Sequence, residues 1–194
     1  GRGYLKKKCS KCGEVKSLKD FHKSAQSKDG HHHWCKKCVN SNITKIKNTE
    51  RGYLKTRYDS MRARERIRTY RRWGRASKCY ITFEEFLNAF EKHKSIYGMR
   101  SAWGPGINNL EQHLPITMIF LGNGQEGKKG QIKGTQRTAS NLSIDRLDPN
   151  RDYTLQNIIF IRSDENERKK DATYEDCKIQ MRLHEERFIE MKPY

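Results

Sequence analysis

Residues 142–170 read LSIDRLDPNRDYTLQNIIFIRSDENERKK, and this stretch decides the fold of the C-terminal part of the chain. Its first residues alternate between apolar and polar, which is typical of a half-buried strand. The Asp148-Pro-Asn sequence favours a turn, and the apolar run 158–161 predicts a second, more deeply buried strand. Ser163 can cap a helix whose first turn is acidic, as the positive end of a helix dipole favours. The stretch therefore predicts a strand, a loop, a second strand and a helix, in that order.

Two oxygen-bearing side chains of this stretch are candidates for one metal site. Asp145 falls on the predicted first strand, and Asn166 falls in the first turn of the predicted helix. Two oxygen ligands that converge across such a unit suit a hard divalent cation that keeps several waters. Taken alone, Asp145 is better explained as a strand-end charge paired to Arg146 or Arg151. Asn166 alone is explained as an exposed helix residue, so only their joint placement favours a metal site.

The order of these elements and residues resembles the HNH, or ββα-metal, nuclease family. The similarity is closest to the branch of small zinc-associated HNH proteins whose first strand reads Ser-x-Asp-Arg-Ile-Asp, which is SIDRLD at residues 143–148 here. Tyr153-Thr, Asn157 and the Asn-Glu-Arg-Lys sequence at 166–169 continue the match, which covers about residues 140–176. The resemblance implies a metal-dependent endonuclease that hydrolyses DNA phosphodiester bonds.

The resemblance also implies a role for each matched residue. Asp145 and Asn166 would bind one Mg²⁺ or Mn²⁺ ion that polarises the scissile phosphate. Asn157 would hold the loop between the two strands in place. The family's general base is a histidine directly after the first-strand aspartate, and this chain has Arg146 at that position.

Arg146 cannot accept a proton from water near neutral pH, because the pKa of a guanidinium is above about 12. It is able to bind the phosphate as a bidentate cation instead. The base would then be Asp148, a histidine such as His113 or His184, or a metal-bound hydroxide. The predicted catalytic set is Asp145, Arg146, Asp148, Asn157 and Asn166.

Four of the six cysteines form two pairs, Cys9-Ser-Lys-Cys12 and Cys35-Lys-Lys-Cys38. A two-residue gap lets one turn supply two thiolates, and zinc takes about four such ligands in a tetrahedron. We therefore predict a structural four-cysteine zinc site, closed to substrate, that lets a segment with few apolar residues fold. The alternatives are a redox pair and a site in which a histidine between the pairs replaces one thiolate. Paired cysteines of this kind favour a reducing, DNA-containing compartment such as the cytoplasm over secretion.

The segment 51–80 is strongly basic, with 11 Lys and Arg residues against two acidic ones. An apolar helix face is predicted by residues that recur at spacings of three and four: Leu54, Tyr58 and Met61, then Ile67, Tyr70 and Trp73. The rest of the helix carries almost only positive charge, whereas an ordinary solvated helix mixes both signs. We therefore predict that this helix follows the phosphates of DNA. The predicted DNA contacts are Arg62, Arg64, Arg66, Arg68, Arg71 and Arg72 on this helix, and Lys128 and Lys129 in a later basic loop.

The composition agrees with a polyanionic partner. Lys and Arg outnumber Asp and Glu by 41 to 23, which gives a net charge of +18. Such a surplus favours nucleic acid, because each phosphate contact releases condensed counterions. No apolar run approaches the ~20 residues that span a bilayer, so no membrane partner is expected.

A further helix is predicted upstream of the HNH-like stretch. Thr82-Phe-Glu-Glu85 has the sequence of a capping box, which marks a helix start. Phe83, Phe86 and Phe90 then fall on one face, together with Leu87, and are predicted to belong to the core.

These observations predict a small, helix-rich α+β protein. An N-terminal zinc module with four cysteine ligands, over 1–42, is followed by a basic helical DNA-binding linker over 43–78. An HNH-like nuclease domain with a ββα-metal core occupies 79–194 and contains a basic loop at 122–140. The leading hypothesis is a metal-dependent DNA endonuclease of homing, phage or restriction type, as a monomer or a homodimer. The alternatives are a catalytically inactive zinc-containing DNA-binding protein on the same fold and an RNA-bound structural protein.

Overall fold

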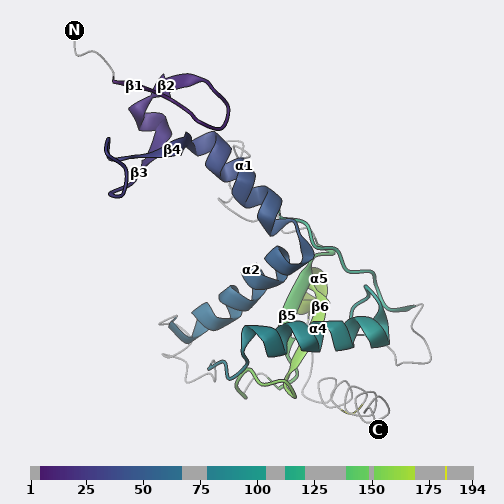
Figure 1. The fold of residues 1–194 in the computed structure, drawn as a ribbon. Coiled ribbons are helices and arrows are strands. Elements are labelled where there is room, and N and C mark those ends of the chain that lie inside the picture. The colour runs from purple at the N-terminus through teal and green to yellow at the C-terminus, as the bar shows by residue number, and fades with distance from the viewer. Residues whose placement is uncertain are drawn as a thin grey trace. The chain divides into compact units, whose positions relative to one another are not determined.

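The computed structural model describes residues 5–66, 78–103, 112–120, 139–148 and 151–168, together with Arg182. Over these residues the chain is a small mixed α/β protein with four α-helices and three short antiparallel strand pairs (Figure 1). It divides into two compact units, one formed by residues 1–49 with 120–135 and the other by 50–119 with 136–194. The segment predicted as one basic linker, 43–78, contributes residues to both units.

The first unit is built from two small hairpins and a helix. Strands β1 (Lys6–Lys8) and β2 (Val15–Ser17) pair antiparallel, and a 3-10 turn, η1 (Leu18–Asp20), leads on to the second hairpin. This hairpin pairs β3 (Phe21–Lys23) with β4 (His31–Cys35). Helix α1 (Lys36–Lys47) follows β4 without a loop.

Little apolar surface is buried among the residues of this unit that the structure describes. Its core cluster consists of Cys9, Phe21 and Cys35, with Trp34 and Cys38 packed against it. None of the 12 residues of α1, all of which the structure describes, is buried. A core of this size contributes too little burial energy to stabilise a fold by itself.

The end of α1 is fixed by Asn48, which follows the helix. The Asn48 side chain donates to the Phe120 carbonyl at 2.9 Å and accepts from the Phe120 amide at 2.8 Å. The ammonium of Lys47 lies 4.5 Å from the centre of the Phe120 ring. These contacts bring residue 120 into the first unit, 72 residues beyond Asn48.

The second unit contains the predicted strand, strand and helix, and this prediction is confirmed. Strand β5 (Leu142–Arg146) pairs antiparallel with β6 (Ile158–Arg162), and α5 (Ser163–Arg168) starts directly after β6. Before them in the sequence come α2 (Glu50–Ala63), the 3-10 turn η2 (Arg64–Arg66) and α4 (Phe83–Tyr97).

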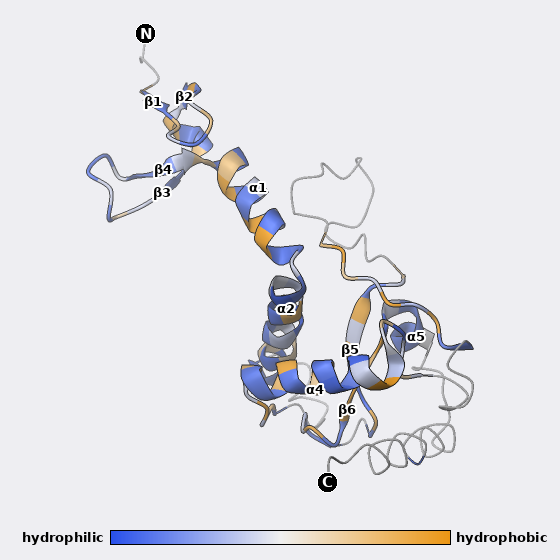
Figure 2. Ribbon diagram, turned by 45° about the vertical axis from the view of Figure 1, so that its right-hand side comes forward, coloured by the Kyte–Doolittle hydropathy of each residue, from blue (hydrophilic) through white to orange (hydrophobic). Residues whose placement is uncertain are grey.

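Helix α4 contributes three aromatic side chains to the core of this unit, Phe86, Phe90 and Tyr97. The capping box at Thr82 and Glu85 is present, as predicted. Phe86 and Phe90 are fully buried, and each lies against Phe160 of β6, with ring centres 5.4 and 5.2 Å apart. The predicted core residues Phe83 and Leu87 are half-buried. Hydrophilic and hydrophobic residues alternate along α4, as expected for a helix with one buried face (Figure 2).

Helix α2 covers the hairpin with its apolar face. Leu54, Tyr58 and Met61 are buried, which confirms the first half of the predicted stripe, and Tyr53 is buried beside them. The second half, Ile67, Tyr70 and Trp73, lies outside the described residues. The Tyr53 hydroxyl donates to the Leu142 carbonyl at the start of β5, at 3.2 Å. The Tyr58 hydroxyl donates to the Ile81 carbonyl at 2.9 Å, just before α4. Two tyrosine hydroxyls therefore fix α2 to the elements on either side of it.

Two buried histidines hold the turn that follows α4. His93 on α4 is 3% exposed, and its Nε2 lies 2.9 Å from the Arg100 carbonyl. His113 is fully buried, and its Nδ1 lies 2.7 Å from the Ser101 carbonyl. Tyr97 lies against both imidazoles, with ring centres 4.9 Å from His93 and 5.6 Å from His113. Both histidines are therefore part of the core.

Candidate functional site

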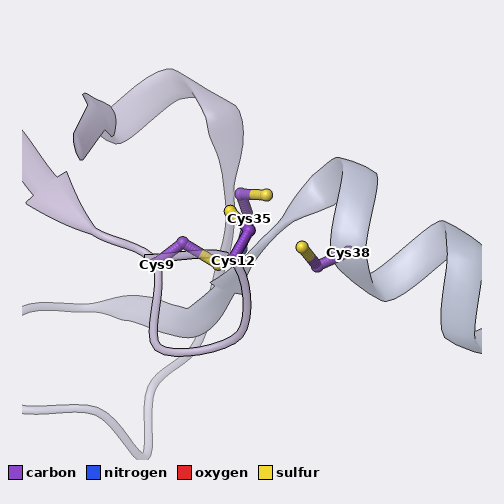
Figure 3. Close-up of side chains that lie close together, drawn as sticks. All are labelled: Cys9, Cys12, Cys35 and Cys38. Carbon is purple, nitrogen blue, oxygen red and sulfur yellow. Dashed lines mark hydrogen bonds between the residues drawn. The ribbon is translucent and has the colours of Figure 1, made fainter. Parts of the chain in front are cut away.

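The four paired cysteines converge on one point (Figure 3). Their Sγ atoms all lie within 4.8 Å of one another, and they form a group that could hold a metal ion. Cys9 and Cys35 are buried, Cys38 is half-buried and Cys12 is exposed. The group contains no histidine, although three histidines, at positions 31–33, lie just before the second pair in the sequence.

The first pair is positioned by a tight turn between β1 and β2. The Gly13 amide donates to the Cys9 carbonyl at 2.9 Å, and the Cys9 amide donates to the Glu14 carbonyl at the same distance. Gly13 has a φ of +76°, a conformation that a residue without a Cβ adopts at little cost. The turn therefore directs the thiols of Cys9 and Cys12 to the same side.

The second pair is positioned by the junction of β4 with α1. Cys35 is the N-cap residue of α1, and Cys38 lies in the first turn of that helix. Residues three apart on a helix lie on the same face, so both thiols reach the same point. The Cys35 amide also donates to Cys9 Sγ at 3.3 Å, which links the two pairs. The positive end of the helix dipole favours thiolates at this position.

The electrostatics of the four thiols match a cation site. Burial alone would raise the pKa of the Cys9 thiol, but hydrogen bonds from the backbone of Cys12, Cys35 and Lys11 outweigh it and lower that pKa to about 6. Burial, together with the neighbouring cysteines, raises the pKa of Cys38 to about 12. The four thiols therefore do not all ionise equally readily. A cation bound by all four sulfurs would favour the deprotonated form of each thiol.

The second candidate site lies on one face of the β5–β6 hairpin. Ser143 pairs with Ile161 and Asp145 pairs with Ile159, so these side chains share one face. The side-chain amide of Asn166, on α5, donates from Nδ2 to Ser143 Oγ at 2.7 Å. Asp145 and Asn166 are both half-buried. The structure thus brings Asn166 onto the face of the hairpin that carries Asp145.

Asn157 organises the loop between the two strands. Its side chain is 2% exposed, and its Oδ1 accepts from the Asp148 amide at 2.8 Å. Its Nδ2 donates to the carbonyls of Asp148 and Asp152 at 3.1 and 2.9 Å. One side-chain amide thus makes three hydrogen bonds to the loop backbone, and it holds Asp148 at the start of that loop.

Arg146 lies on the opposite face of β5 from Asp145. Its side chain is 7% exposed, and Nη1 donates to the Arg151 carbonyl at 3.0 Å. Its guanidinium lies 4.9 Å from the centre of the Tyr153 ring, and that of Arg64 lies 5.6 Å from the same ring. Arg64 also donates to the Tyr153 hydroxyl. Arg146 and Arg64 therefore anchor the β5–β6 loop through a buried tyrosine.

The remaining predicted residues have varied surroundings. His113, named as a possible base, is fully buried in the core, and His184 lies outside the described residues. Of the predicted DNA contacts, Arg62 and Arg66 are exposed and Arg64 is engaged by Tyr153. Five predicted DNA contacts lie outside the described residues: Arg68, Arg71, Arg72, Lys128 and Lys129.

The sequence prediction missed Ser143. The signal was present, because Ser143 and Asp145 are two residues apart on a predicted strand and therefore share a face. Its hydrogen bond with Asn166 joins residues 23 positions apart. That bond could not be predicted without knowing where the helix packs on the strands.

A comparison of the chain with protein-family models, characterised proteins and solved structures finds no match. Among the described residues, no helix is both long enough and apolar enough to cross a membrane.

Proposed function

We propose that the chain is a metal-dependent endonuclease of the HNH type that hydrolyses phosphodiester bonds in DNA. The observation that carries the proposal is the 2.7 Å hydrogen bond between Asn166 and Ser143, because it sets Asn166 on the Asp145 face of the hairpin. The Asn157 hydrogen bonds support it, since they hold the adjoining loop in one conformation.

In this proposal Asp145 and Asn166 hold one Mg²⁺ or Mn²⁺ ion. A carboxylate and an amide oxygen are the donors that such hard cations prefer, and the ion would polarise the scissile phosphate. Ser143 is a positioning residue, because its hydroxyl takes the Nδ2 hydrogen of Asn166 and leaves Oδ1 as the ligand atom. Asn157 acts through the loop and touches no reacting atom.

Arg146 serves as a loop anchor in this proposal and takes no part in proton transfer. Its position on the opposite face and its contact with Tyr153 support that role. His113 is unsuited as a base because it is fully buried and bonded to the Ser101 carbonyl. We assign the proton-accepting role to Asp148, which begins the loop that Asn157 holds.

The cysteine group is proposed to bind a structural zinc ion. Zn–S bonds of about 2.3 Å place tetrahedral sulfurs roughly 3.8 Å apart, within the spacing of these four thiols. Four protein ligands leave no position for a substrate, so the ion would stabilise the first unit and take no part in hydrolysis.

Plasmid cleavage tests the nuclease proposal. Supercoiled plasmid is incubated with the zinc-loaded protein and Mg²⁺ or Mn²⁺, and nicked and linear products are quantified. We expect cleavage by the wild type and a loss of about 100-fold or more in Asp145→Ala and Asn166→Ala. Asp59→Ala is the matched control, because Asp59 is an exposed carboxylate paired with Lys55 on α2. Absence of cleavage by the wild type with every metal and salt concentration would contradict the proposal.

A second candidate is a DNA-binding protein without nuclease activity on the same scaffold. It is favoured by Arg146, which occupies the position of the general-base histidine of HNH nucleases. Arg146 is also buried against Tyr153. This alternative predicts salt-dependent DNA binding by the wild type without strand cleavage, and no effect of Asp145→Ala on binding.

A further inference from the structure

Three lysines of the first unit, Lys7, Lys11 and Lys47, lie over an aromatic ring, and Lys11 lies nearest to the cysteine pairs in the sequence. Lys11 lies in the turn between Cys9 and Cys12, and its Nζ is 5.2 Å from the centre of the Trp34 ring. Trp34 packs against the cysteine core, whereas Lys11 itself is exposed. A cation over a tryptophan face is held in place while its ammonium stays accessible to solvent.

Two other lysines of this unit are paired with carboxylates. Lys7 pairs with Asp29 at 2.7 Å, and Lys16 pairs with Glu14 at 2.6 Å. Residues 5–49 contain 12 lysines and only three acidic residues. Within the described part of the chain, no carboxylate pairs with Lys11. Its charge therefore remains available to an external anion.

Two imidazoles lie beside the tryptophan that Lys11 contacts. The rings of His32 and His33 stack with centres 4.2 Å apart, and the His33 ring meets Trp34 edge-on at 5.5 Å. The amide and hydroxyl of Ser10 both donate to the His33 carbonyl, at 3.1 and 3.2 Å. The strand that carries the histidines is thus fixed against the cysteine turn that carries Lys11.

We propose that Lys11, His32, His33 and Trp34, named here the Lys11 surface, form a binding site for the phosphodiester backbone of DNA. An ammonium without a carboxylate partner, and imidazole N–H donors around the same tryptophan, are groups that bind phosphate oxygens. Such contacts do not distinguish one DNA sequence from another. The site would therefore increase affinity and fix the position of the DNA backbone on the protein. The inference rests on the proposed function in taking DNA as the partner, but it concerns the first unit and none of the hydrolytic residues.

A competing role for Lys11 is to balance the charge of the metal site. Four thiolates around one divalent ion carry a net negative charge, and the Lys11 backbone donates to Cys9 within the same turn. In that case, replacement of Lys11 would weaken metal retention and leave DNA binding by the metal-loaded protein unchanged.

The two roles are separated by measuring DNA affinity and zinc content together. The probe is a fluorescent duplex of random sequence, titrated with the full-length, zinc-loaded chain in chelator-free buffer without Mg²⁺, over a series of salt concentrations. The variants are Lys11→Gln and His33→Gln. Lys16→Gln is the matched control, because it removes a lysine from the same unit that is already paired with Glu14.

The proposal expects Lys11→Gln to bind DNA severalfold more weakly, with the slope of log affinity against log salt reduced by about 0.9. Zinc content stays at the wild-type value, His33→Gln weakens binding in the same direction, and Lys16→Gln has little effect. Equal affinities for Lys11→Gln and Lys16→Gln would overturn the inference, as would zinc loss confined to Lys11→Gln. Absence of DNA binding by the wild type would instead contradict the proposed function itself.

Discussion

The two units of this chain are stabilised by different means. The first buries Cys9, Phe21 and Cys35 around its cysteine group, and its helix α1 has no buried residue among the 12 described. The second buries aromatic and branched residues from two helices and a hairpin, with Phe160 in contact with both Phe86 and Phe90. This difference leads us to propose that the first unit is stabilised by a metal ion and the second by packing, so that each can be destabilised separately.

Removal of the metal should have the largest effect. We expect a chelator to unfold the first unit, because structural zinc contributes about 10–16 kcal/mol to folding in small zinc modules. Amide hydrogen exchange should become fast over residues 5–47 and remain slow over β5 and β6. Cys35→Ser should reproduce the effect without chelator, and Cys79→Ser, outside the cysteine group, is its control. Slow exchange in the first unit after complete zinc removal would contradict the comparison.

Loss of packing should affect only the second unit. Phe160→Ala is expected to lower its free energy of unfolding by about 3–5 kcal/mol, because the ring is 4% exposed and its removal leaves a cavity in the core. Zinc content should not change. Tyr80→Ala is the matched control, since that side chain is 65% exposed and its loss costs less than about 0.5 kcal/mol. Denaturant titration monitored by hydrogen exchange distinguishes the units, and equal losses for both variants would rule out this core.

Acid should weaken the second unit through His93. Burial lowers the pKa of His93 to about 4, opposed by its hydrogen bond to the Arg100 carbonyl and assisted by His113. A folded-state pKa below the unfolded value of about 6.5 means that folding favours the neutral form of the His93 imidazole. The resulting stability is present above pH 6.5 and falls by about 3 kcal/mol as the pH drops towards 4.

His93→Phe tests this dependence, because it keeps the stacking on Phe90 and Tyr97 but cannot be protonated. The variant should show a smaller loss of unfolding free energy than the wild type as the pH falls from about 6.5 to about 4.5. His22→Phe, at an exposed position of the first unit, is the control. A wild-type stability that is flat over this range would contradict the burial argument.

Several parts of the fold were predictable from local sequence. Each of these parts depends on residues within a few positions of one another: the turns that hold each cysteine pair, the capping box at Thr82, and the order of strand, strand and helix. The break between α1 and α2 was not predictable, because it is fixed by Asn48 binding Phe120, 72 residues away. The predicted boundary at residue 42 consequently falls inside α1.

The candidate site shows the same division. Asp145 and Asn166 were identifiable by their places in a predicted strand and helix. The contact of Arg146 with Tyr153 was not, because the place of Tyr153 also depends on Arg64, which binds it from 89 residues away. Contacts of that range are set by packing and leave no periodic signal in the sequence.

Replacement of Asn157 should have a smaller effect on stability, confined to the loop between β5 and β6. Asn157→Ala leaves the Asp148 amide and two carbonyls without their partner, and we expect a loss of about 1–3 kcal/mol in the second unit. Asn88→Ala, at an exposed position on α4, is the control. If hydrogen exchange at residues 147–153 is the same in both variants, Asn157 does not organise the loop.

The most direct test of the central claim is a Mn²⁺ titration of the zinc-loaded protein, followed by the electron paramagnetic resonance signal of free Mn²⁺. We predict one Mn²⁺ site per chain in the wild type and in Asp59→Ala. The site should be lost in Asp145→Ala and weakened by about 10–100-fold in Ser143→Ala, with recovery in Ser143→Thr. A wild type that binds no Mn²⁺, or an Asp145→Ala variant that binds it as tightly as the wild type, would contradict the claim that Asp145, Asn166 and Ser143 form a metal site.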